Sequence, residues 1–386
     1  MAEPLHDIII IGAGIMGSCT AYHAAKQGLK PLVLEQFVNG HRKGSSHGKS
    51  RIIRFAHANE AYVPIMKEAY ELWEDLEDLC GEELINKSGL LWLSDAMTTK
   101  RNSRILNDYD IEHAVLKGRE IQVAYPQIRY NHEWYGLIDS DGGVIYADKC
   151  MKATQDEAVK HGAEFRHCEK VKEVKSEPDR VVVITDKGTY YAKNVAVTAG
   201  GWLNKILPDF DDIIETQAEQ VAVIYWKVKD NFSLYEPSSN CPVIVIEENG
   251  DLMYMLPPVD HYRQIKLSLH VSEPIDPDKP LSDLPPWIIQ RVQEHINEHF
   301  PDIDASKPST TEICMYTMTE DGHCALGRYP SDPRITIAGG FSGAGFKLAI
   351  VVGRMLTDLA KGAEETEVIP ELFRFERHRT ENLDPY

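Results

Sequence analysis

The sequence predicts a mixed α/β protein (α+β when taken as a whole) with two domains, and three observations support this prediction. The chain has 386 residues, whereas a typical domain has roughly 100–200. After Asp7, residues 8–11 form a continuous apolar run that leads into a glycine-rich turn and a helical stretch, as in a buried parallel strand followed by a helix. Between about residues 216 and 304 the pattern changes to short alternating strands and proline-rich loops, including those at 257–258 and 285–286.

The N-terminal pieces stand in the order strand, turn, helix, strand. Residues 12–17 read Gly-Ala-Gly-Ile-Met-Gly, a complete G-x-G-x-x-G. A helical stretch from residue 18 to about 27 follows, Gly28 is its expected stop, and residues 31–35 form the next strand. This order and spacing predict one βαβ unit.

The glycines and the terminal acid of this unit suit a dinucleotide. Gly12 allows the tight turn, Gly14 lets a pyrophosphate approach the backbone, and Gly17 lets the helix pack closely on the strand. Unpaired N–H groups at the helix N-terminus favour a phosphate. Glu35 is placed to accept hydrogen bonds from ribose hydroxyls, which disfavours the 2′-phosphate of NADP. The unit therefore predicts dinucleotide binding and leaves NAD and FAD open.

Composition argues against several classes of partner. Hydrophobic residues make up 43% of the chain, too many for a protein that stays disordered. The 60 acidic and 41 basic residues give a net charge of −19, which repels nucleic-acid phosphates and anionic membranes. No apolar run approaches the roughly 18 residues of a transmembrane segment. We therefore expect neither nucleic acid nor a membrane as a partner.

The cysteines and the chain ends favour a reducing compartment. The seven cysteines include no Cys-x-x-Cys pair, which argues against a disulfide framework and a zinc knuckle. The His-Cys pairs at 167–168 and 323–324 lack partners at a metal-site spacing, so we predict no metal. Residues 1–7 lack the features of a signal peptide, and residues 384–386 are not a Ser-Lys-Leu type signal. We expect the cytoplasm or the peroxisome.

Five motifs follow one another in a recognisable order along the chain. They are the glycine-rich turn at 12–17, Gly-Ser-Ser-His-Gly before Arg-Ile-Ile-Arg at 44–54, Thr-Ala-Gly-Gly-Trp at 198–202, Cys-Met-Tyr-Thr at 314–317, and Gly-Phe-Ser-Gly-Ala-Gly-Phe-Lys at 340–347. Together they resemble the monomeric sarcosine oxidase and L-pipecolate oxidase family, FAD-dependent amine oxidases of the D-amino-acid oxidase superfamily. The animal members look most similar, and the resemblance spans residues 8 to about 359.

The resemblance implies a Rossmann-like FAD-binding domain with an inserted antiparallel-sheet substrate domain. We expect a discontinuous FAD-binding domain over residues 1–84, 148–214 and 309–386, and a substrate-binding domain over 85–147 and 215–308. The family also implies a monomer.

The implied activity is FAD-dependent oxidation of a secondary or cyclic amino acid, of the sarcosine or L-pipecolate type, to an imine. O₂ would be reduced to hydrogen peroxide, so the partners would be a small-molecule amino acid and O₂. Two alternatives stay open. One is an oxidase of glycated (fructosyl) amino acids, and the other is a flavin-binding protein that has lost turnover.

The resemblance also assigns the FAD site. Cys314 matches the cysteine that forms a thioether to the flavin 8α-methyl group, so covalent FAD is expected, although a lone cysteine is more often a small buried hydrophobe. The expected cofactor-binding residues are Gly12, Gly14, Ile15, Met16, Gly17, Glu35, Gln36, Arg42, Ser45, Ser46, His47, Arg51, Val171, Ala199, Gly200, Trp202, Cys314, Gly343, Ala344, Gly345 and Lys347.

Lys266 and His270 are the first candidate catalytic residues. Apolar residues alternate along 265–269, so on a strand Lys266 and His270 share the opposite face. That face could simply meet water. The resemblance instead assigns the oxygen-activating lysine to Lys266 and an active-site histidine to His270. A fixed ammonium near the flavin would stabilise the superoxide anion that forms from O₂.

Four further residues complete the expected catalytic set. Arg54 and Lys347 would bind the substrate carboxylate, which the planar fork of an arginine suits well. Lys347 stands near the start of a predicted helix, where a cation opposes the helix dipole, so we expect a negative group nearby. Tyr254 and Tyr316 match tyrosines that line the pocket, although core packing explains a buried tyrosine equally well.

Ala344 is the main departure from the family pattern, which usually has histidine between the two glycines of Gly-x-Gly-Phe-Lys at 343–347. Alanine removes an imidazole from beside the substrate and opens space. We therefore expect a substrate that is bulkier than sarcosine, or one with a group that the histidine would block.

Overall fold

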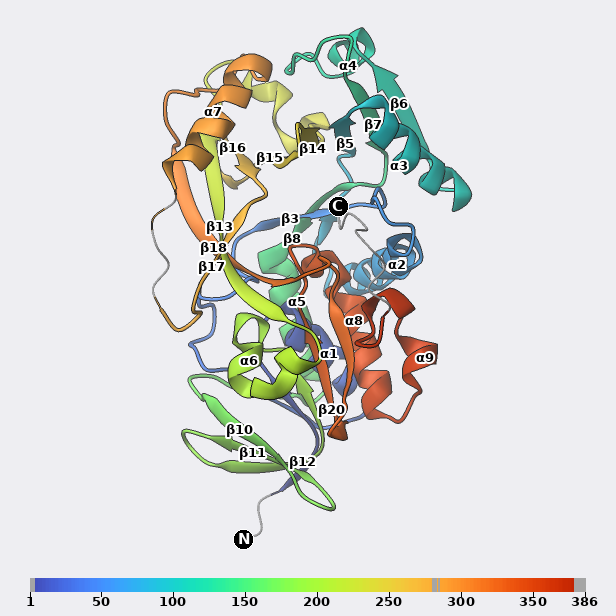
Figure 1. Ribbon diagram of the computed structural model, residues 1–386, viewed down its shortest axis with the longest axis vertical. Helices are drawn as coiled ribbons and strands as arrows, with labels where there is room; N and C mark the ends of the chain where they lie inside the picture. Colours follow the sequence, from blue (N-terminus) through green and yellow to red (C-terminus); the bar gives the residue numbers. More distant parts are fainter. Residues whose placement is uncertain (1–3, 280–282, 284, 378–386) are drawn as a thin grey trace.

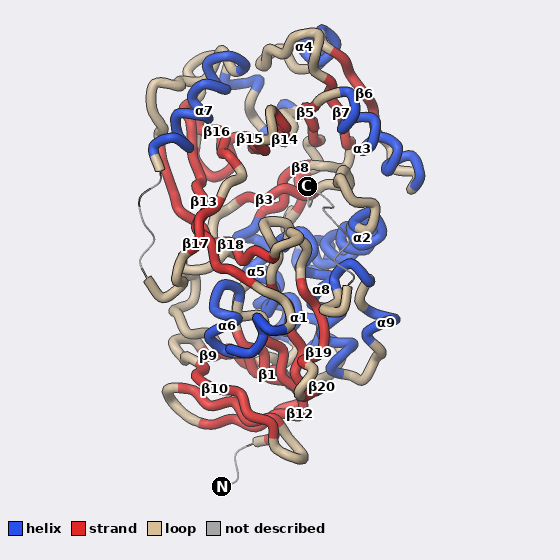
Figure 2. Tube along the Cα trace, viewed as in Figure 1, coloured by secondary structure: helices blue, strands red, loops and turns tan. Residues whose placement is uncertain are grey.

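The computed structural model describes residues 4–279, 283 and 285–377, and the strands within these residues form three sheets (Figures 1 and 2). The two larger sheets lie toward opposite ends of the long axis, with the small sheet between them (Figure 1). The extreme ends that entered the targeting prediction, residues 1–3 and 384–386, lie outside the described residues.

The first large sheet has a parallel centre. β1 pairs in parallel with β2 and β12, β2 with β9, and β12 with β20, whereas β10, β11 and β19 add antiparallel pairs. Its strands are β1 (Leu5–Ile11), β2 (Pro31–Leu34), β9 (Glu164–Arg166), β10 (Val171–Ser176), β11 (Val181–Thr185), β12 (Thr189–Val197), β19 (Ala325–Tyr329) and β20 (Asp332–Gly339). The predicted βαβ unit is confirmed, because β1 and β2 are parallel neighbours in this sheet.

Four helices pack together beside this sheet: α1 (Ile15–Lys26), α2 (Tyr62–Cys80), α5 (Ala147–Lys160) and α8 (Gly345–Ala360). The short helices α6 (Leu203–Ile206) and α9 (Glu365–Val368) belong to the same half of the molecule (Figure 1). α1 begins three residues earlier than the predicted residue 18. The Ser46 hydroxyl accepts the N–H of Ile15 at 2.9 Å, so a residue distant in sequence caps the helix inside the glycine motif.

The second large sheet is antiparallel except for the parallel pair β5–β14, and its order is β17-β13-β16-β15-β14-β5-β7-β6, with β18 beside β13. Its strands are β5 (Leu90–Ser94), β6 (His113–Lys117), β7 (Tyr135–Asp139), β13 (Thr216–Lys227), β14 (Val243–Glu248), β15 (Asp251–His261), β16 (Gln264–Leu269), β17 (Ser272–Pro274) and β18 (Thr310–Thr319). Helices α3 (Ala96–Asp108), α4 (Arg119–Ala124) and α7 (Pro286–His299) accompany it. A mixed α/β fold with an antiparallel sheet is therefore confirmed.

The small sheet connects the two halves. It contains β3 (Ser50–Ile53), β8 (Gly143–Tyr146) and β4 (Ile85–Asn86), in the order β3-β8-β4. Two strand pairs cross the predicted domain boundaries. β8, in the segment predicted for the substrate domain, pairs with β3 of the predicted FAD domain. β18, predicted for the FAD domain, pairs with β13 of the predicted substrate domain. The domain boundaries themselves remain a prediction.

The expected loop at Pro257-Pro258 is wrong, because both prolines lie inside β15. The ladder between β15 and β16 is irregular there, with a register shift between Leu256 and His261. Proline has no N–H to donate, so it is tolerated where the ladder is interrupted. Pro286, in contrast, is the first residue of α7, a position that suits proline.

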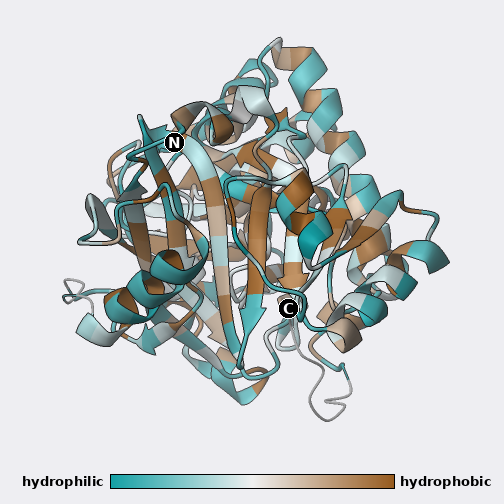
Figure 3. Ribbon diagram, turned by 90° about the horizontal axis from the view of Figure 1, so that it is seen from above, coloured by the Kyte–Doolittle hydropathy of each residue, from teal (hydrophilic) through white to brown (hydrophobic). Residues whose placement is uncertain are grey.

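Apolar side chains fill the space between these layers. In Figure 3 the central strands show long brown stretches, whereas the peripheral helices alternate teal and brown. On α7, Ile288, Val292 and Ile296 are buried in one cluster with Ile265 and Leu267 of β16. Within the described part of the chain, no helix is long and apolar enough to cross a bilayer.

Candidate active site

A cavity of about 1050 Å³ lies where the two large sheets approach each other. On one side it is lined by residues that follow the carboxyl ends of parallel strands: Gly12 after β1, Glu35 after β2 and Thr198 after β12. On the other side it is lined by Tyr225 of β13 and Tyr316 of β18. Ligands of open α/β sheets bind at the carboxyl ends of the strands, so this cavity is the candidate active site.

Most of the predicted cofactor residues line this cavity. Those that do are Gly12, Gly14, Ile15, Met16, Glu35, Gln36, Arg42, Ser45, Ser46, His47, Arg51, Val171, Ala199, Gly200, Trp202, Gly343 and Gly345. Gly17, Cys314, Ala344 and Lys347 are not among its lining residues, and neither are five of the six predicted catalytic residues, Tyr316 being the exception. The fold thus brings together segments that are far apart in sequence.

Close backbone contacts require the glycines of the first turn. Gly12 has a φ of +100°, and a Cβ on it would lie 2.7 Å from the carbonyl oxygen of Thr198. A Cβ on Gly17 would lie only 1.9 Å from the carbonyl oxygen of Gly12. Glycine is therefore needed at both positions. The first turn of α1 stands at the cavity wall, a position that favours a phosphate group.

Glu35 holds this turn as well as lining the cavity. Its carboxylate accepts the N–H of Ala13 through Oε2 and the N–H of Phe37 through Oε1, each at 2.9 Å. Burial raises the pKa of Glu35, but hydrogen bonds from His41, Ala13 and Phe37 outweigh it, so the pKa lies below its usual value. The carboxylate is charged at neutral pH and can accept a further donor from a ligand.

The basic loop at residues 44–51 is folded against β18 by its own side chains. The Ser45 hydroxyl donates to the carbonyl oxygen of Met315 at 2.5 Å. The guanidinium of Arg51 donates to the carbonyl oxygens of Ser45 and His47 at 2.7 and 2.6 Å, and lies 5.7 Å from the ring centre of Phe346. Arg51 therefore shapes the loop, and its positive charge stands at the cavity wall.

Cys314 lies on the cavity side of β18. Glu312, Tyr316 and Thr317 of β18 line the cavity, and Cys314 shares its strand face with Glu312 and Tyr316, because residues two apart on a strand point the same way. The thiol is buried, with its Sγ 4.0 Å from the carbonyl oxygen of Gly44, which also lines the cavity. The cysteine is thus placed next to the loop that carries the predicted flavin contacts.

Lys266 is buried, which excludes the alternative that its strand face meets water. Its Nζ donates to the Ser50 hydroxyl at 2.7 Å and lies 3.1 Å from Oδ2 of Asp260 and 5.6 Å from the ring centre of Tyr225. Asp260 and Tyr225 line the cavity. Burial lowers the pKa of Lys266, while the carboxylate of Asp260 acts against that shift. The ammonium is therefore held beside the cavity by a buried counter-ion.

Arg54 and Lys347 form a second buried cationic group. The guanidinium of Arg54 stacks over Trp92, with its Cζ 4.6 Å from the ring centre. Lys347 donates to the carbonyl oxygen of Ala344 at 3.1 Å. Burial first, and the charge of Arg54 second, hold the pKa of Lys347 well below its usual value. The sequence predicted a negative group beside Lys347, but the strongest charged neighbour is another cation.

Arg54 and Lys347 also lower the pKa values of two nearby histidines. The pKa of His270 is lowered to about 4 by burial and then by the charges of Arg54 and Lys347. The pKa of His57 is lowered well below its usual value by burial, Lys347 and Arg54. Both imidazoles are therefore neutral at neutral pH. His270 follows β16 rather than lying in it, and its ring centre is 5.3 Å from that of Tyr316.

The predicted tyrosines stand in the same region. A Cβ on Gly343 would lie 2.8 Å from Cε1 of His270 and 3.2 Å from the ring of Tyr316, so the glycine turn before α8 touches both side chains. Tyr254 is opposite Ser268 in the β15–β16 ladder. Burial raises the pKa of Tyr254 to about 12, so its hydroxyl keeps its proton at neutral pH.

Sequence reasoning missed two acids that support these cations. Asp260 lies in the irregular part of β15, where alternation does not reveal which face a residue occupies. Asp139 is fully buried and accepts the N–H groups of Phe55 and Ala56 at 2.6 and 2.9 Å, which fixes the chain directly after Arg54. An isolated aspartate carries no sequence signal for such a role.

Most of the chain matches a known protein family and known proteins. A family model described as FAD dependent oxidoreductase matches residues 7–359. A putative sarcosine oxidase of Caenorhabditis elegans is 37% identical over 94% of this chain and 95% of its own length. The chain belongs to the sarcosine oxidase family of FAD-dependent oxidoreductases. A peroxisomal sarcosine oxidase of Homo sapiens is 36% identical over 93% of each chain.

The fold of this chain is similar to the solved structure of NikD, which is described as an unusual amino acid oxidase essential for nikkomycin biosynthesis. It has a TM-score of 0.81 at 23% identity, and the match covers 95% of this chain and 97% of that one. This likeness supports the fold.

The residues of the cavity fit the FAD that the family uses. Its volume reaches the upper end of the roughly 300–1,000 Å³ typical of ligand sites. The bare glycine turn and the start of α1 suit a pyrophosphate, Glu35 suits a ribose, and the loop with Arg51 and the neighbouring β18 would hold the ring system. The pyrophosphate, a ribose and the ring system thus each have a matching group in the wall.

Proposed function

We propose that this protein oxidises the C–N bond of a secondary or cyclic amino acid to an imine and reduces O₂ to hydrogen peroxide. The amine carbon loses a hydride, which carries two electrons, and the nitrogen loses a proton, so that O₂ gains two electrons and two protons. FAD, when bound, would supply the hydride acceptor and the redox link to O₂. The protein's own residues bind the substrate and stabilise the charge that develops on oxygen.

The pairing of Arg54 and Lys347 supports this proposal most strongly. Arg54 and Lys347, both buried and flanked by neutral His270 and His57, would form a site for an anion. A carboxylate suits it because the guanidinium can bind both oxygens, while the Lys347 amine offers a further donor. The amino acid would then be held by its carboxylate, with its α-carbon next to the cavity that would hold the flavin.

Lys266 supports the choice of O₂ as electron acceptor. A preorganised ammonium lowers the cost of placing an electron on O₂, because the anion forms beside a fixed positive charge. Asp260 and Ser50 hold the ammonium in place through contacts of 3.1 and 2.7 Å. Tyr254 and Tyr316 would close the pocket around the substrate.

Several finer features belong to the proposal. Cys314, on the cavity face of β18, would link FAD covalently as a thioether. Ala344, at the turn that touches His270 and Tyr316, would leave room for a substrate larger than sarcosine. We also propose a monomer in the cytoplasm or the peroxisome, a compartment that the name of the human relative includes.

Hydrogen peroxide release in air from a substrate panel tests the proposal. The panel holds sarcosine, L-pipecolate, L-proline, N-methyl amino acids with large side chains, and a fructosyl amino acid. Release with one of the N-methyl or cyclic compounds is expected. Release with the fructosyl amino acid alone would favour an oxidase of glycated amino acids. If yellow, folded protein releases no hydrogen peroxide with any of these compounds, the result would count against the proposed substrate class.

A further inference from the structure

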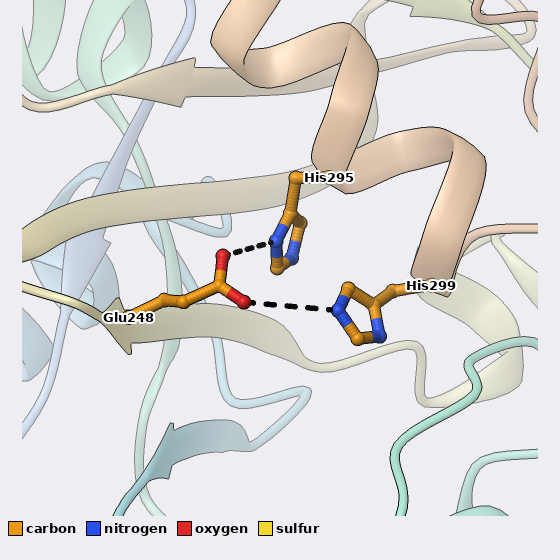
Figure 4. Close-up of side chains that lie close together, drawn as sticks. All are labelled: Glu248, His295 and His299. Atoms are coloured by element: carbon orange, nitrogen blue, oxygen red, sulfur yellow. Dashed lines mark hydrogen bonds and ion pairs between the residues drawn. The ribbon is translucent and has the colours of Figure 1, made fainter.

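A second cluster of polar side chains lies outside the candidate active site. Figure 4 shows Glu248, the last residue of β14, facing His295 and His299 of α7. Residues four apart on a helix share one face, so both imidazoles reach the same carboxylate. Their potential ligand atoms all lie within 4.8 Å of one another. None of the three lines the cavity.

His299 presents an unused nitrogen to this cluster. Its side chain is 4% exposed, and its Nδ1 is 2.7 Å from the carbonyl oxygen of Arg129. Because a carbonyl only accepts, Nδ1 carries the proton. Nε2 has no hydrogen-bond partner among the described residues, and the nearest carboxylate oxygens, of Glu298 and Glu248, are 3.8 and 4.0 Å away. A buried lone pair directed at carboxylates is unfavourable without a cation.

His295 is held in the way that metal-binding histidines are held. Its side chain is fully buried, with Nδ1 3.0 Å from Oε2 of Glu248 and Nε2 3.0 Å from the hydroxyl of Tyr130. If Nδ1 binds a metal, the ring proton moves to Nε2 and is donated to Tyr130. A hydrogen bond from the second ring nitrogen is the usual way to orient a metal-binding imidazole.

Glu248 is oriented from the opposite side. Arg291 donates to Oε2 of Glu248 at 2.6 Å and to Oδ2 of Asp251 at 2.6 Å. This leaves Oε1 facing His299, as the second dashed line in Figure 4 shows. Tyr130 stacks on His299 with ring centres 4.3 Å apart and so fixes the second imidazole. All three side chains therefore have positions set by neighbouring residues.

We propose that Glu248, His295 and His299 bind one Zn²⁺, with water as the fourth ligand. Imidazole and carboxylate suit Zn²⁺, whereas Mg²⁺ prefers oxygen ligands alone. In tetrahedral zinc sites with bonds of about 2.0–2.2 Å, neighbouring ligand atoms lie roughly 3.4 Å apart. The contacts to Glu248 lie on either side of that spacing and use different oxygens: Nδ1 of His295 is 3.0 Å from Oε2, and Nε2 of His299 is 4.0 Å from Oε1. The ion would connect α7 to β14 and stabilise the second sheet. This site is independent of the proposed oxidase activity.

The test uses untagged, flavin-containing protein, with metal content measured per protein after gel filtration. Protein treated with a chelator and then incubated with a slight excess of Zn²⁺ should retain about one zinc, and its Tm should rise by roughly 2–4 °C. Co²⁺ in place of Zn²⁺ should give the visible absorption of a tetrahedral site beyond the flavin bands. Mg²⁺ should produce neither effect.

Variants separate this site from adventitious binding. Glu248→Gln and His299→Gln should lose the retained zinc and the rise in Tm, whereas the control His132→Gln, at an exposed histidine, should keep both. Zinc retained equally by His299→Gln and the wild type would overturn the assignment. So would wild-type protein that retains no Zn²⁺ and shows no Co²⁺ bands, a result that holds even if a variant fails to fold.

Discussion

The ammonium of Lys266 lies 3.1 Å from the carboxylate of Asp260, and both side chains are almost fully buried. Asp260 also accepts the N–H of Lys49 at 3.1 Å and the hydroxyl of Ser50. Burial raises the pKa of Asp260, but Lys266 and Ser50 outweigh it, so the pKa lies below its usual value and the group is charged. The pair is therefore a buried ion pair at the wall of the cavity, and it positions the cation that we expect O₂ to meet.

Removing the charge of Lys266 should slow the reaction with O₂ selectively. In Lys266→Met we expect the reoxidation rate to fall roughly 10²–10³-fold, a typical effect of losing one preorganised electrostatic group. The rate at which substrate reduces the flavin should change far less. Stopped-flow measurement of the two half-reactions checks this, and equal losses in both would contradict the role.

The pH profile should reveal the role of Asp260. Burial lowers the pKa of Lys266, and Asp260 raises it, so the rate of reaction with O₂ should fall as pH rises through the pKa of Lys266. In Asp260→Asn that pKa loses its supporting charge and drops further. The falling limb of the profile should then move to lower pH. An unchanged limb would mean that Asp260 does not control the protonation of Lys266.

Arg54 and Lys347 should affect substrate binding through the carboxylate. Arg54→Met and Lys347→Met should each lower kcat/KM by roughly 10–100-fold, the cost of losing one hydrogen bond to a charged group. Arg54→Lys should recover part of the loss, because one charge returns without the planar fork. The comparison uses amino acids against the matching amines that lack a carboxylate. The amines should be oxidised slowly by the wild type and should be insensitive to these variants.

Cys314 should determine whether the flavin stays with the denatured protein. Acid precipitation of the wild type should leave a yellow pellet and a colourless supernatant. With Cys314→Ser, the flavin should appear in the supernatant. Cys324, another buried cysteine, provides the matched control, because Cys324→Ser should keep the yellow pellet. Release of the flavin from the wild type would contradict a covalent link.

Restoring histidine at Ala344 tests the idea of an opened pocket. The imidazole would enter the region of His270 and Tyr316, since Gly343 next to it already touches both. In Ala344→His the ratio of kcat/KM for a large N-methyl amino acid to that for sarcosine should fall roughly tenfold, in the range seen for small changes in pocket volume. Ala344→Ser, a smaller change, serves as the control. An unchanged substrate ranking would refute the idea.

Local pattern was enough to predict the first βαβ unit. The apolar run, the glycines and Glu35 stand close together in sequence, and their geometry depends mainly on short-range sterics, as the contacts of Gly12 and Gly17 demonstrate. The start of α1 was misplaced because its cap, Ser46, comes from a later loop.

The environment of the charged residues was harder to predict. Alternation placed Lys266 on one face of a strand, but the choice between water and a buried site depends on Ser50 and Asp260, which come from other strands. Asp260 follows a register shift at Leu256, where sequence periodicity fails. The cluster around Glu248 was missed for the same reason, because only the packing of α7 brings β14 to its histidines.

The most direct test of the central account is to mix the yellow protein with an N-methyl or cyclic amino acid in the absence of O₂, and then to admit O₂. We predict that the flavin absorbance bleaches before O₂ is admitted and returns afterwards, with one hydrogen peroxide formed for each flavin. Bleaching without return would contradict the oxidase role of the Lys266 site. A flavin that keeps its colour with every secondary amino acid would contradict the proposed substrate class itself.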